Sequence, residues 1–496
     1  MPHPTADPAG TRQQLATLRP TLLPHYDTAL PGAHAAILAR LLLALEHEPL
    51  PGLTSRHHHH HGHTTVTFTH TTITYPTAAA TAFTTPPDGL TATTATGTPI
   101  TDPAQLTALL WPGTPLITEI ANSVANLALA RANTPPADTG PGALEQTLVD
   151  GHPLHPCCRT RTGMTVADIL TYAPEHHPVI HLRRLAVPPE RWHGNSPPVL
   201  LAHPWQAPRL LTEHPWLTDL GPTGPTRPLM SLRTVAPLDG GPHIKTAVDI
   251  QMTSAIRTVS PAAVHNGPRL STLLQKLTTD LPLTVLAETN AGAVITDHGP
   301  DRRLAHLTRQ PPPDDAIPLG LLPQHLHTID NPHTLMTDLC RILFIPLATL
   351  LARGIALEAH GQNTLIRLHH GRAVHTYYRD LGGVRTHTTR LTRTGHPDPG
   401  LHGDIPTDDL TELRTKLSAA ALATVARQTI TALTTHHGAD PHHLWTTLAT
   451  ALRTTPDGHH LTTDPLPVKA TTAMRLATDP LHDQWTHLDN PMAAGS

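Results

Sequence analysis

Two histidines and two arginines lie close together in the segment 151–163. His152 and His155 each precede a proline, which fixes its own φ and drives the preceding residue toward extended backbone. We therefore expect a stiff loop here rather than a helix. Arg159 and Arg161 follow in the same segment, and arginine keeps its charge at physiological pH. Two imidazoles beside two permanent cations predict a surface that binds a polyanion.

Four further residues have the chemistry of a phosphate site. Ser231 and Arg233 would point to the same face of an extended segment. Lys245 and Arg257 follow after a turn. Phosphates need several fixed cations and a hydroxyl, with arginine giving two-point contacts and lysine a point charge. Structural ion pairs of the two arginines are the alternative.

A third group of polar residues surrounds a predicted β-hairpin with strands at 364–368 and 373–379. Glu358 ends the helix before the hairpin, Asn363 enters the hairpin and Asp380 leaves it. Antiparallel register brings positions 363 and 380 to the same open end. A Mg²⁺–ATP site needs one or two carboxylates besides phosphate oxygens and water. The three side chains could therefore converge on one metal ion.

Standard nucleotide-binding and hydrolase signatures are absent from the sequence. It contains no GxxxxGK[ST], no GxGxxG after a predicted strand, and no HExxH, GxSxG or CxxC pair. A phosphate site would therefore have to be assembled from dispersed side chains.

In the order in which they occur, five segments resemble those of the NRPS-independent siderophore synthetases, the aerobactin-synthetase-like (IucA/IucC) family. The resemblance covers roughly residues 140–385 and, more briefly, the C-terminal end around Pro467-Val468-Lys469. The five segments are 151–163, His203-Pro204-Trp205-Gln206, Ser231-Leu232-Arg233-Thr234, Lys245 with Arg257, and Glu358-Ala359-His360-Gly361-Gln362-Asn363 followed by Arg379-Asp380.

The resemblance implies an ATP site in the central part of the chain. In related synthetases, residues matching Ser231, Arg233 and Lys245 contact the ATP phosphates. Arg159 stands where the family usually has lysine, which keeps the charge but changes the donor geometry. The implied ATP-binding residues are Arg159, Ser231, Arg233, Lys245, Gln362 and Asp380.

The resemblance also implies a metal site and a carboxylate site. The implied Mg²⁺ ligands are Glu358, Asn363 and Asp380. The implied contacts to the substrate carboxylate are His155, Arg257, His360 and Lys469, of which Arg257 and His360 are also the implied catalytic residues. A helix C-cap is the alternative for His360, and a solvated lysine at a helix start is the alternative for Lys469.

The implied fold is α+β, a multi-lobed cupped hand with the ATP cleft between its lobes. We expect an N-terminal lobe at 1–140, a central ATP- and carboxylate-binding lobe at 141–330, and a mostly helical C-terminal lobe with the metal-binding hairpin at 331–496. The implied activity is ATP- and Mg²⁺-dependent adenylation of a carboxylate, followed by amide or ester formation with an amine or alcohol. The acid would be citrate, a citrate derivative or a succinyl-hydroxamate. Relatives are often dimers, which leaves a homodimer open.

Composition bounds the function further. A chain of 496 residues exceeds one compact core, so two or three domains are expected. Hydrophobic residues make up 38% and aromatic residues 3%, which predicts a largely aliphatic core. A net charge of −4 without a basic stripe argues against nucleic-acid binding.

We expect a cytoplasmic protein outside the membrane. The N-terminus lacks a charged segment followed by an apolar one, as a secretion signal would have. The most apolar run, 339–357, contains Arg341, Pro346 and Arg353 and is interpreted as a buried helix pair. Three cysteines make no disulfide framework, which fits a reducing compartment.

Hydrophobic periodicity predicts the main elements. Helices are expected at 34–47, 116–131, 334–357 and 408–434. Strands are expected at 64–75, 199–202, 243–250 and 283–295, while 86–103 and 135–141 are expected to link elements. The histidine-rich run 57–63 is interpreted as a solvated loop, with metal binding as the alternative.

Two alternatives to a synthetase remain open. The 41 histidines motivate a non-catalytic protein that binds a metal or a ferric siderophore. A degenerate family member is the other alternative, because the chain is shorter than many relatives. Retention of the phosphate-site and hairpin residues argues against the second.

Overall fold

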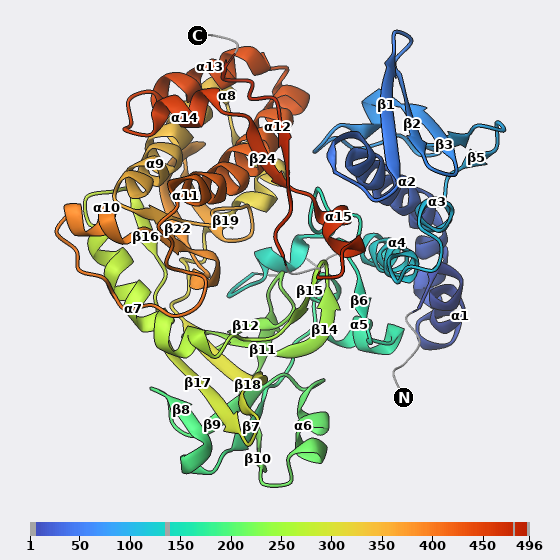
Figure 1. Cartoon of the computed structure of the whole chain (residues 1–496). Helices are drawn as coiled ribbons and strands as arrows, with labels where there is room; N and C mark the ends of the chain where they lie inside the picture. The colour runs from blue at the N-terminus through green and yellow to red at the C-terminus, as the bar shows by residue number, and fades with distance from the viewer. Residues whose placement is uncertain (1–5, 134–138, 480–481, 494–496) are drawn as a thin grey trace.

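The computed structural model describes residues 6–133, 139–479 and 482–493. Helices and sheets are mixed throughout, which confirms the α+β class. An N-terminal part, a central part built on sheets and a largely helical C-terminal part can be followed by colour in Figure 1, and the segment carrying β24 and α15 returns from the C-terminal part toward the N-terminal helices.

The N-terminal part packs helices against a five-stranded antiparallel sheet of order β1-β2-β3-β4-β5. Its helices are α1 (Pro8–Leu18), α2 (Leu23–His47), α3 (Pro103–Leu110) and α4 (Leu116–Ala132). Its strands are β1 (Leu53–His59), β2 (His63–Phe68), β3 (Thr72–Pro76), β4 (Ala92–Thr94) and β5 (Pro99–Ile100). The predicted helices at 34–47 and 116–131 are confirmed, the first as the C-terminal half of α2.

Three predictions for this part are wrong in detail. The expected strand at 64–75 is two strands, because residues 69–71 turn the chain between β2 and β3. The expected linker at 86–103 contributes β4 and β5 to the sheet. The histidine run is not a free loop, since His57 to His59 pair with β2 as part of β1. The expected linker at 135–141 lies largely outside the described residues.

The central part contains a six-stranded sheet of order β11-β12-β13-β18-β17-β8 and two three-stranded sheets, β10-β7-β9 and β15-β14-β6. Its strands are β6 (Arg161–Thr162), β7 (Arg183–Ala186), β8 (Trp192–Gly194), β9 (Val199–Ala202), β10 (Thr218–Pro222), β11 (Thr226–Pro228), β12 (Thr234–Pro237), β13 (His243–Thr246), β14 (Val248–Met252), β15 (Ala255–Arg257), β17 (Glu288–Thr296) and β18 (Gly299–Arg309). Its helices are α5 (Val166–Tyr172), α6 (Ala207–Glu213) and α7 (Ala262–Leu277). The predicted strand at 199–202 is confirmed. Those at 243–250 and 283–295 are each divided into two strands.

The C-terminal part surrounds a four-stranded sheet of order β16-β22-β21-β19 with helices. Its strands are β16 (Leu283–Val285), β19 (Ala316–Pro318), β20 (Ile355–Ala356), β21 (Thr364–His369), β22 (Arg372–Tyr378), β23 (Arg385–Thr386), β24 (Leu466–Lys469) and β25 (Trp485–Leu488). Its helices are α8 (Pro332–Leu339), α9 (Ile345–Ala352), α10 (Thr388–Arg393), α11 (Leu410–Leu417), α12 (Arg427–His437), α13 (Pro441–Leu452), α14 (Gly458–Thr463) and α15 (Thr471–Leu476). The predicted hairpin and both predicted helical regions are confirmed, with π-helical turns at Cys340–Phe344 and Ser418–Ala426 inside the helical runs.

Two large apolar cores hold these parts together. One spans Leu270 to Met492 and fills the C-terminal part. The other joins α1 to α4 with Cys157, Met164 and Val248 of the central part and with Ala473 of α15. The second core therefore crosses the expected boundary at residue 140, and the three-lobe division stays a prediction.

Two described helical runs, Pro20–His47 and Pro332–Ala352, are long and apolar enough to cross a membrane by length and composition alone. Most of each apolar window is buried inside the protein, as in the core helices of a folded domain. The second run coincides with the one interpreted above as a buried helix pair.

Candidate functional site

An ion pair between the six-stranded sheet and the end of the β21–β22 hairpin marks the centre of the candidate site. Lys245 of β13 places its Nζ 2.8 and 2.7 Å from the two carboxylate oxygens of Asp380. Asp380 has a φ of 73°, a left-handed conformation that is uncommon outside glycine. The Tyr378 hydroxyl donates to the Asp380 carbonyl at 3.1 Å and helps to hold this backbone. Such strained backbone is concentrated at functional sites.

Several cations keep Asp380 ionised. Burial opposes its charge, but Lys245, Arg309 and Arg233 outweigh burial and hold the pKa of Asp380 well below its usual range. Burial also lowers the pKa of the Lys245 ammonium, and Asp380 partly offsets that effect. Asp380 is therefore ionised near neutral pH.

The two predicted phosphate-site arginines lie beside this pair. Arg233 donates from Nη1 to the Thr258 carbonyl at 2.9 Å, and burial together with Arg257 lowers the pKa of Arg233 to about 10. Arg257 donates from Nε to the Met252 carbonyl at 3.2 Å. Neither arginine has a carboxylate partner within salt-bridge distance among the described residues, so the alternative of structural ion pairs is not supported there.

The sequence suggested an extended segment at Ser231, but the structure places Ser231 in a turn. Leu232 has a φ of 65°, which makes residues 229–233 a tight turn before β12 begins at Thr234. The Arg233 amide donates to the Ser231 carbonyl at 2.8 Å inside this turn. The turn, rather than strand alternation, keeps Ser231 and Arg233 near each other.

Two buried charged residues belong to the same neighbourhood and were missed by the sequence reasoning. Arg309 ends β18, and its Nε has no hydrogen-bond partner among the described residues. Burial and Arg379 lower the pKa of Arg309 to about 10. Glu288 begins β17 opposite Arg309 and accepts a hydrogen bond from the Leu381 amide at 3.1 Å. Burial raises the pKa of Glu288. Neither residue lies in a recognisable motif; only sheet register reveals them.

A second group of polar residues lies where the chain enters the hairpin. Glu358 contacts Lys416 of α11 at 3.3 Å and Lys469 of β24 at 4.0 Å. The Asn363 Nδ2 lies 3.3 Å from His360 Nε2 and donates to the Glu358 carbonyl at 3.4 Å. His360 Nδ1 accepts from the backbone amide of Gln362 at 3.2 Å, which places Gln362 in the same turn. Lys416 is another residue that the sequence reasoning missed.

The histidines of the 151–163 loop face this second group. Desolvation, together with the nearby His360, Arg257 and Lys469, lowers the pKa of His152 to about 3. Burial also holds the pKa of His155 well below its usual range. His155 Nε2 lies 2.6 Å from the Ser254 hydroxyl, and its Nδ1 accepts from the Cys157 amide at 2.9 Å. Both imidazoles are therefore neutral at pH 7, in a region rich in cations.

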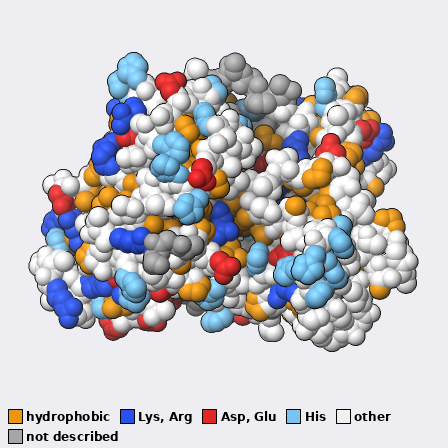
Figure 2. All heavy atoms as spheres, turned by 90° about the horizontal axis from the view of Figure 1, so that it is seen from above, with side chains coloured by type: hydrophobic (Ala, Val, Ile, Leu, Met, Phe, Trp, Pro, Cys, Tyr) orange, Lys and Arg blue, Asp and Glu red, His pale blue; other side chains and the backbone are white. Residues whose placement is uncertain are grey.

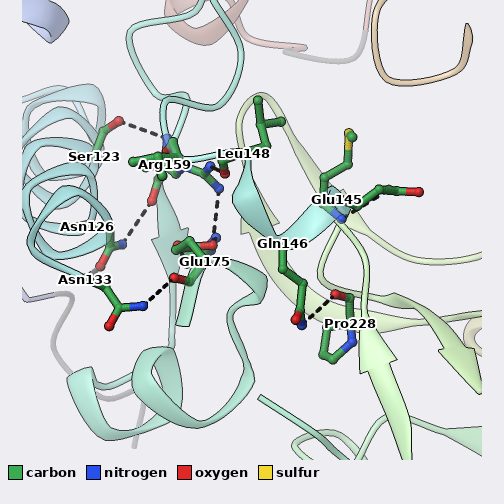
Figure 3. Close-up of polar contacts among 12 residues, drawn as sticks. Ser123, Asn126, Asn133, Glu145, Gln146, Leu148, Arg159, Glu175 and Pro228 are labelled. Carbon is green, nitrogen blue, oxygen red and sulfur yellow. Dashed lines mark hydrogen bonds and ion pairs between the residues drawn. The ribbon is translucent and has the colours of Figure 1, made fainter. Parts of the chain in front are cut away.

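The arginines of the same loop are held by internal partners, which corrects the expectation that they form part of a polyanion surface, and Figure 3 shows Arg159 with Leu148 and Glu175. Arg159 donates to the carbonyls of Val149 at 2.7 Å and Leu148 at 2.5 Å. It also contacts the buried Glu175 at 3.4 Å. Arg161 binds both oxygens of Glu175, at 2.5 and 2.9 Å. These contacts use the guanidinium donors of Arg159 within the protein.

The three expected Mg²⁺ ligands offer the hard oxygen donors that this ion prefers. A Cβ on Gly383 would fall 2.0 Å from Glu358 Oε2, so the absence of a side chain there makes room for the carboxylate. The carboxylates of Glu358 and Asp380 are each paired with a lysine, which a bound cation would have to replace. Among the described residues no group of three or more His, Cys, Asp or Glu side chains is arranged to hold a metal ion. Glu358 and Asp380 alone therefore do not form a metal cage, so a Mg²⁺ ion here would need phosphate oxygens as further ligands, and the described histidine run is not arranged as a metal site.

Comparison with known proteins places this geometry in context. Residues 142–198 and 195–324 match the IucA / IucC family, and residues 333–492 match the family described as ferric iron reductase FhuF-like transporter. Staphyloferrin A synthase of Staphylococcus aureus is 27% identical over 307 residues, which is 49% of this chain and 52% of that protein. D-Ornithine–citrate ligase of the same organism is 23% identical over 349 residues, 52% of each chain. The chain thus matches about half the length of these curated relatives.

The fold is that of solved siderophore synthetases. ATP-bound aerobactin synthetase IucA of Klebsiella pneumoniae has a TM-score of 0.75 with 19% sequence identity, covering 93% of this chain and 99% of that one. This similarity concerns the fold, and it covers nearly the whole chain. Residues 142–324 are thus similar to the IucA / IucC family over the part of the chain that carries the central sheets.

Proposed function

We propose that the protein is an ATP-dependent ligase of siderophore assembly that adenylates a carboxylate and joins it to an amine or alcohol. The observation that carries the proposal is the set of buried and half-buried cations without carboxylate partners among the described residues around the Lys245–Asp380 pair. Arg233, Arg257 and Arg309 offer the concentrated charge that a triphosphate needs and that a protein interior does not otherwise tolerate. The curated relatives, named staphyloferrin A synthase and D-ornithine–citrate ligase, support the same class of reaction.

ATP would lie against the sheet with its phosphates toward β13 and β18. Arg233 and Arg309 would contact phosphate oxygens, and Lys245 would exchange part of its contact with Asp380 for the phosphates. Ser231 and Gln362 are the neutral polar residues proposed for the same site. Arg159 is left out of the proposed set because its donors are held by Leu148, Val149 and Glu175.

The carboxylate substrate would lie between the 151–163 loop and the hairpin. His155 and His360 are neutral donors there, and Arg257 and Lys469 supply positive charge. Preorganised donors of this kind stabilise negative charge that develops in the transition state. Citrate is the simplest acid that fits such a site, because its three carboxylates match several cations.

The proposed reaction has two steps. A carboxylate oxygen of the acid attacks the α-phosphorus of ATP, the bond to the bridging β-phosphate oxygen breaks, and pyrophosphate leaves. The neutral amine or the hydroxyl then attacks the acyl carbon, the bond from that carbon to the AMP oxygen breaks, and AMP leaves. One proton is released from the attacking nitrogen or oxygen to a neutral imidazole or to water. Holding the two reactants in line for attack supplies a large part of the rate acceleration in such a reaction.

Glu358, Asn363 and Asp380 would hold a Mg²⁺ ion together with phosphate oxygens, and the ion would neutralise charge on the triphosphate. The lysines that now contact the two carboxylates are the groups that would have to move. This can be tested without turnover. Mg²⁺ is titrated into wild type and Glu358→Gln in the presence of a non-hydrolysable ATP analogue, and the heat of binding is measured by calorimetry.

Pyrophosphate release across a panel of acids tests the function. The panel contains citrate, citryl monoamides, succinate-capped hydroxamates and α-ketoglutarate, with hydroxylamine as a general trap for acyl-adenylates. We expect release that depends on one class of acid and falls at least about 100-fold in Arg257→Ala, as for loss of a transition-state contact. Silence across the panel together with no heat of ATP binding would reject the ligase.

A further inference from the structure

The segment that follows Lys469 leads from the C-terminal part to the helices of the N-terminal part (Figure 1). Lys469 ends β24, and α15 begins two residues later at Thr471. Ala470 and Ala473 of this segment are buried in the apolar core that α1 to α4 share with the central part. A lysine assigned to the substrate carboxylate is therefore attached to a helix that another part of the molecule holds.

The position of α15 must come from its contacts with other elements. The helix has only 6 residues. Isolated helices shorter than about 12 residues are marginal in water, so such a helix does not hold itself together. Two carboxylates of the N-terminal part contact it, one at each end.

Glu48 contacts the beginning of α15. Glu48 directly follows α2, and its own amide donates to the Ala44 carbonyl at 2.8 Å. Its Oε2 accepts a hydrogen bond from the backbone amide of Ala473 at 2.7 Å, and the residue is buried. The first amides of a helix have no partner within the helix, so this acceptor satisfies one of them and favours this placement of α15.

A two-point ion pair holds the end of the same helix. Arg475 places its Nε 3.0 Å from Glu119 Oε2 and its Nη2 2.5 Å from Glu119 Oε1. The two side chains are only 12% and 5% exposed. Arginine–carboxylate pairs of this type fix orientation as well as distance. The Nη1 of Arg475 donates to the Ser254 carbonyl at 3.4 Å, so the guanidinium group is directed to protein partners.

The same ion pair borders the loop that carries His155. The Thr160 hydroxyl donates to the Glu119 carbonyl at 2.7 Å. Ser254, whose carbonyl accepts from Arg475, has its hydroxyl 2.6 Å from the Nε2 of His155. Glu119 of α4 therefore contacts both α15 and the histidine loop, which are distant in the sequence.

The contacts of Lys469 itself are weaker. Its Nζ lies 2.8 Å from Asp483 Oδ1 and 4.0 Å from Glu358 Oε1. The Lys469 and Asp483 side chains are 36% and 33% exposed, and partly exposed ion pairs contribute little free energy. The backbone that carries Lys469 must therefore set the position of its ammonium group.

We propose that Glu48, Glu119 and Arg475 are positioning residues for the carboxylate substrate, because they hold α15 and α15 sets where Lys469 meets the acid. The N-terminal part would thus contribute to acid binding without touching the acid. The inference rests on the proposed function for the identity of the acid site, whereas the anchoring of α15 rests on these contacts alone.

Kinetics with the acid and binding of ATP separate positioning from loss of the fold. The acid is citrate, or whichever acid of the panel supports pyrophosphate release with hydroxylamine as trap. In Arg475→Ala we expect KM for this acid to rise at least about tenfold, and the affinity for a non-hydrolysable ATP analogue to stay within about twofold of wild type. The double variant Glu119→Ala/Arg475→Ala leaves no buried charge unpaired and should match Arg475→Ala.

A second ion pair offers a matched control. Arg390 forms a largely buried two-point pair with Asp457 in the C-terminal part, at 2.7 and 3.0 Å. Arg390→Gln should lower stability, as loss of a buried ion-pair partner does, and should leave KM for the acid unchanged. An increase in KM for the acid that is equal in Arg390→Gln and Arg475→Ala would overturn the proposal.

Combination with Lys469→Ala shows whether the anchors act through Lys469. Lys469→Ala should itself raise KM for the acid, and addition of Arg475→Ala should then raise it by less than about twofold more. Glu48→Ala should resemble Arg475→Ala, while Glu48→Gln keeps an oxygen for the Ala473 amide and should be close to wild type. Effects of Lys469→Ala and Arg475→Ala that multiply in full would overturn the proposal, because Arg475 would then act on its own.

Hydrogen exchange tests the anchoring without turnover. The Met474 amide donates to the Ala470 carbonyl at 2.9 Å within α15. Mass spectrometry of peptides covering 470–476 should show exchange at least about tenfold faster in Arg475→Ala than in wild type, and no change in Arg390→Gln. Wild-type exchange in Arg475→Ala, or an unchanged KM for the acid, would overturn the proposal. A wild-type protein that releases no pyrophosphate with any acid would instead reject the proposed function, and exchange would then decide the anchoring of α15 alone.

Discussion

At the scale of single residues, the buried triad of Arg159, Arg161 and Glu175 shows how the protein uses charge for structure near its site. Glu175 is fully buried and binds both guanidinium groups, which hold its pKa well below its usual range despite the cost of burial. A buried pair contributes little net stability relative to apolar residues, but removal of one partner leaves the others uncompensated.

We therefore expect Glu175→Gln to lower the free energy of unfolding at pH 7.5 by about 3–5 kcal/mol, because two buried guanidinium groups lose their counterion. Urea unfolding followed by circular dichroism measures this change. Asp27→Asn is the matched control, because its partner Arg12 forms an exposed pair and the midpoint should not move measurably. Equal midpoints for Glu175→Gln and wild type would mean that the triad does not hold the loop.

The proposed role of Arg309 in ATP binding can be tested directly. Arg309→Lys keeps the charge but loses the planar fork, so we expect ATP to bind about tenfold more weakly, a loss of about 1.4 kcal/mol. Calorimetry with a non-hydrolysable ATP analogue measures it. Arg303→Lys on the same strand is the control, since Arg303 pairs with Asp301 and Glu213. An identical affinity in both variants would remove Arg309 from the proposed site.

At the scale of elements, the hairpin β21–β22 does most of the positioning. Its register pairs Thr364 with Tyr378, and the Arg379 amide donates to the Asn363 carbonyl at 2.9 Å. Asn363 and Asp380 are thereby held at one open end. Arg379 continues the connection through its buried ion pair with Glu145, at 2.5 and 2.8 Å. The hairpin is thus fixed to the central part through charge as well as through backbone.

The turn after this hairpin gives a prediction with a neighbouring control. A Cβ on Gly383 would fall 2.0 Å from Glu358 Oε2 and 3.0 Å from its Cβ, so Gly383→Ala must displace the carboxylate. A Cβ on Gly382 would lie 3.7 Å from Asp380 Oδ1, an ordinary contact. We expect Gly383→Ala to fold but to need at least tenfold more Mg²⁺ for half-maximal analogue binding, with Gly382→Ala close to wild type. Equal Mg²⁺ dependence in both variants would contradict a metal role for Glu358.

The hairpin also shows why some of the site could be predicted from sequence and some could not. Its two strands and its turn are local, so alternation and a glycine were enough to place Asn363 and Asp380 together. Arg309 and Glu288 meet through the register of β17 and β18, which depends on pairing between distant segments. Lys416 reaches Glu358 from a helix more than fifty residues later in the chain. Arginine is a residue type suited to phosphate binding, but only the packing around Arg159 decides that its donors point to Glu175.

At the scale of the whole molecule, buried histidines make stability depend on pH. Histidines are spread widely over the surface, as Figure 2 shows for one face, but others lie in the interior. Burial lowers the pKa of His203 and His243 to about 3 and that of His176 and His306 to about 4, and it holds the pKa of His155 well below its usual range. In the unfolded chain each of these imidazoles regains a pKa near 6.5.

A buried histidine with a lowered pKa does not weaken the folded state while the same imidazole is neutral in the unfolded chain. Once the unfolded imidazole takes up a proton, the unfolded state is favoured. The unfolded chain takes up more protons below about pH 6.5, so stability is fully present above that pH and falls as the pH drops toward the folded-state values. Each of the four groups with folded values near 3 to 4 costs about 1.4 kcal/mol at pH 5.5, so together they cost about 5 to 6 kcal/mol, which is comparable with the total stability of many domains. We therefore expect the thermal unfolding temperature to be lower by at least about 10 °C at pH 5.5 than at pH 7.5.

A variant with His57, His58 and His59 of the exposed strand β1 changed to glutamine should show the same shift, because those side chains are already in water. A melting temperature that stays constant over this range would mean that the interior histidines are charged in the folded protein, and the neutral imidazoles assigned to the carboxylate site would have to be abandoned with them.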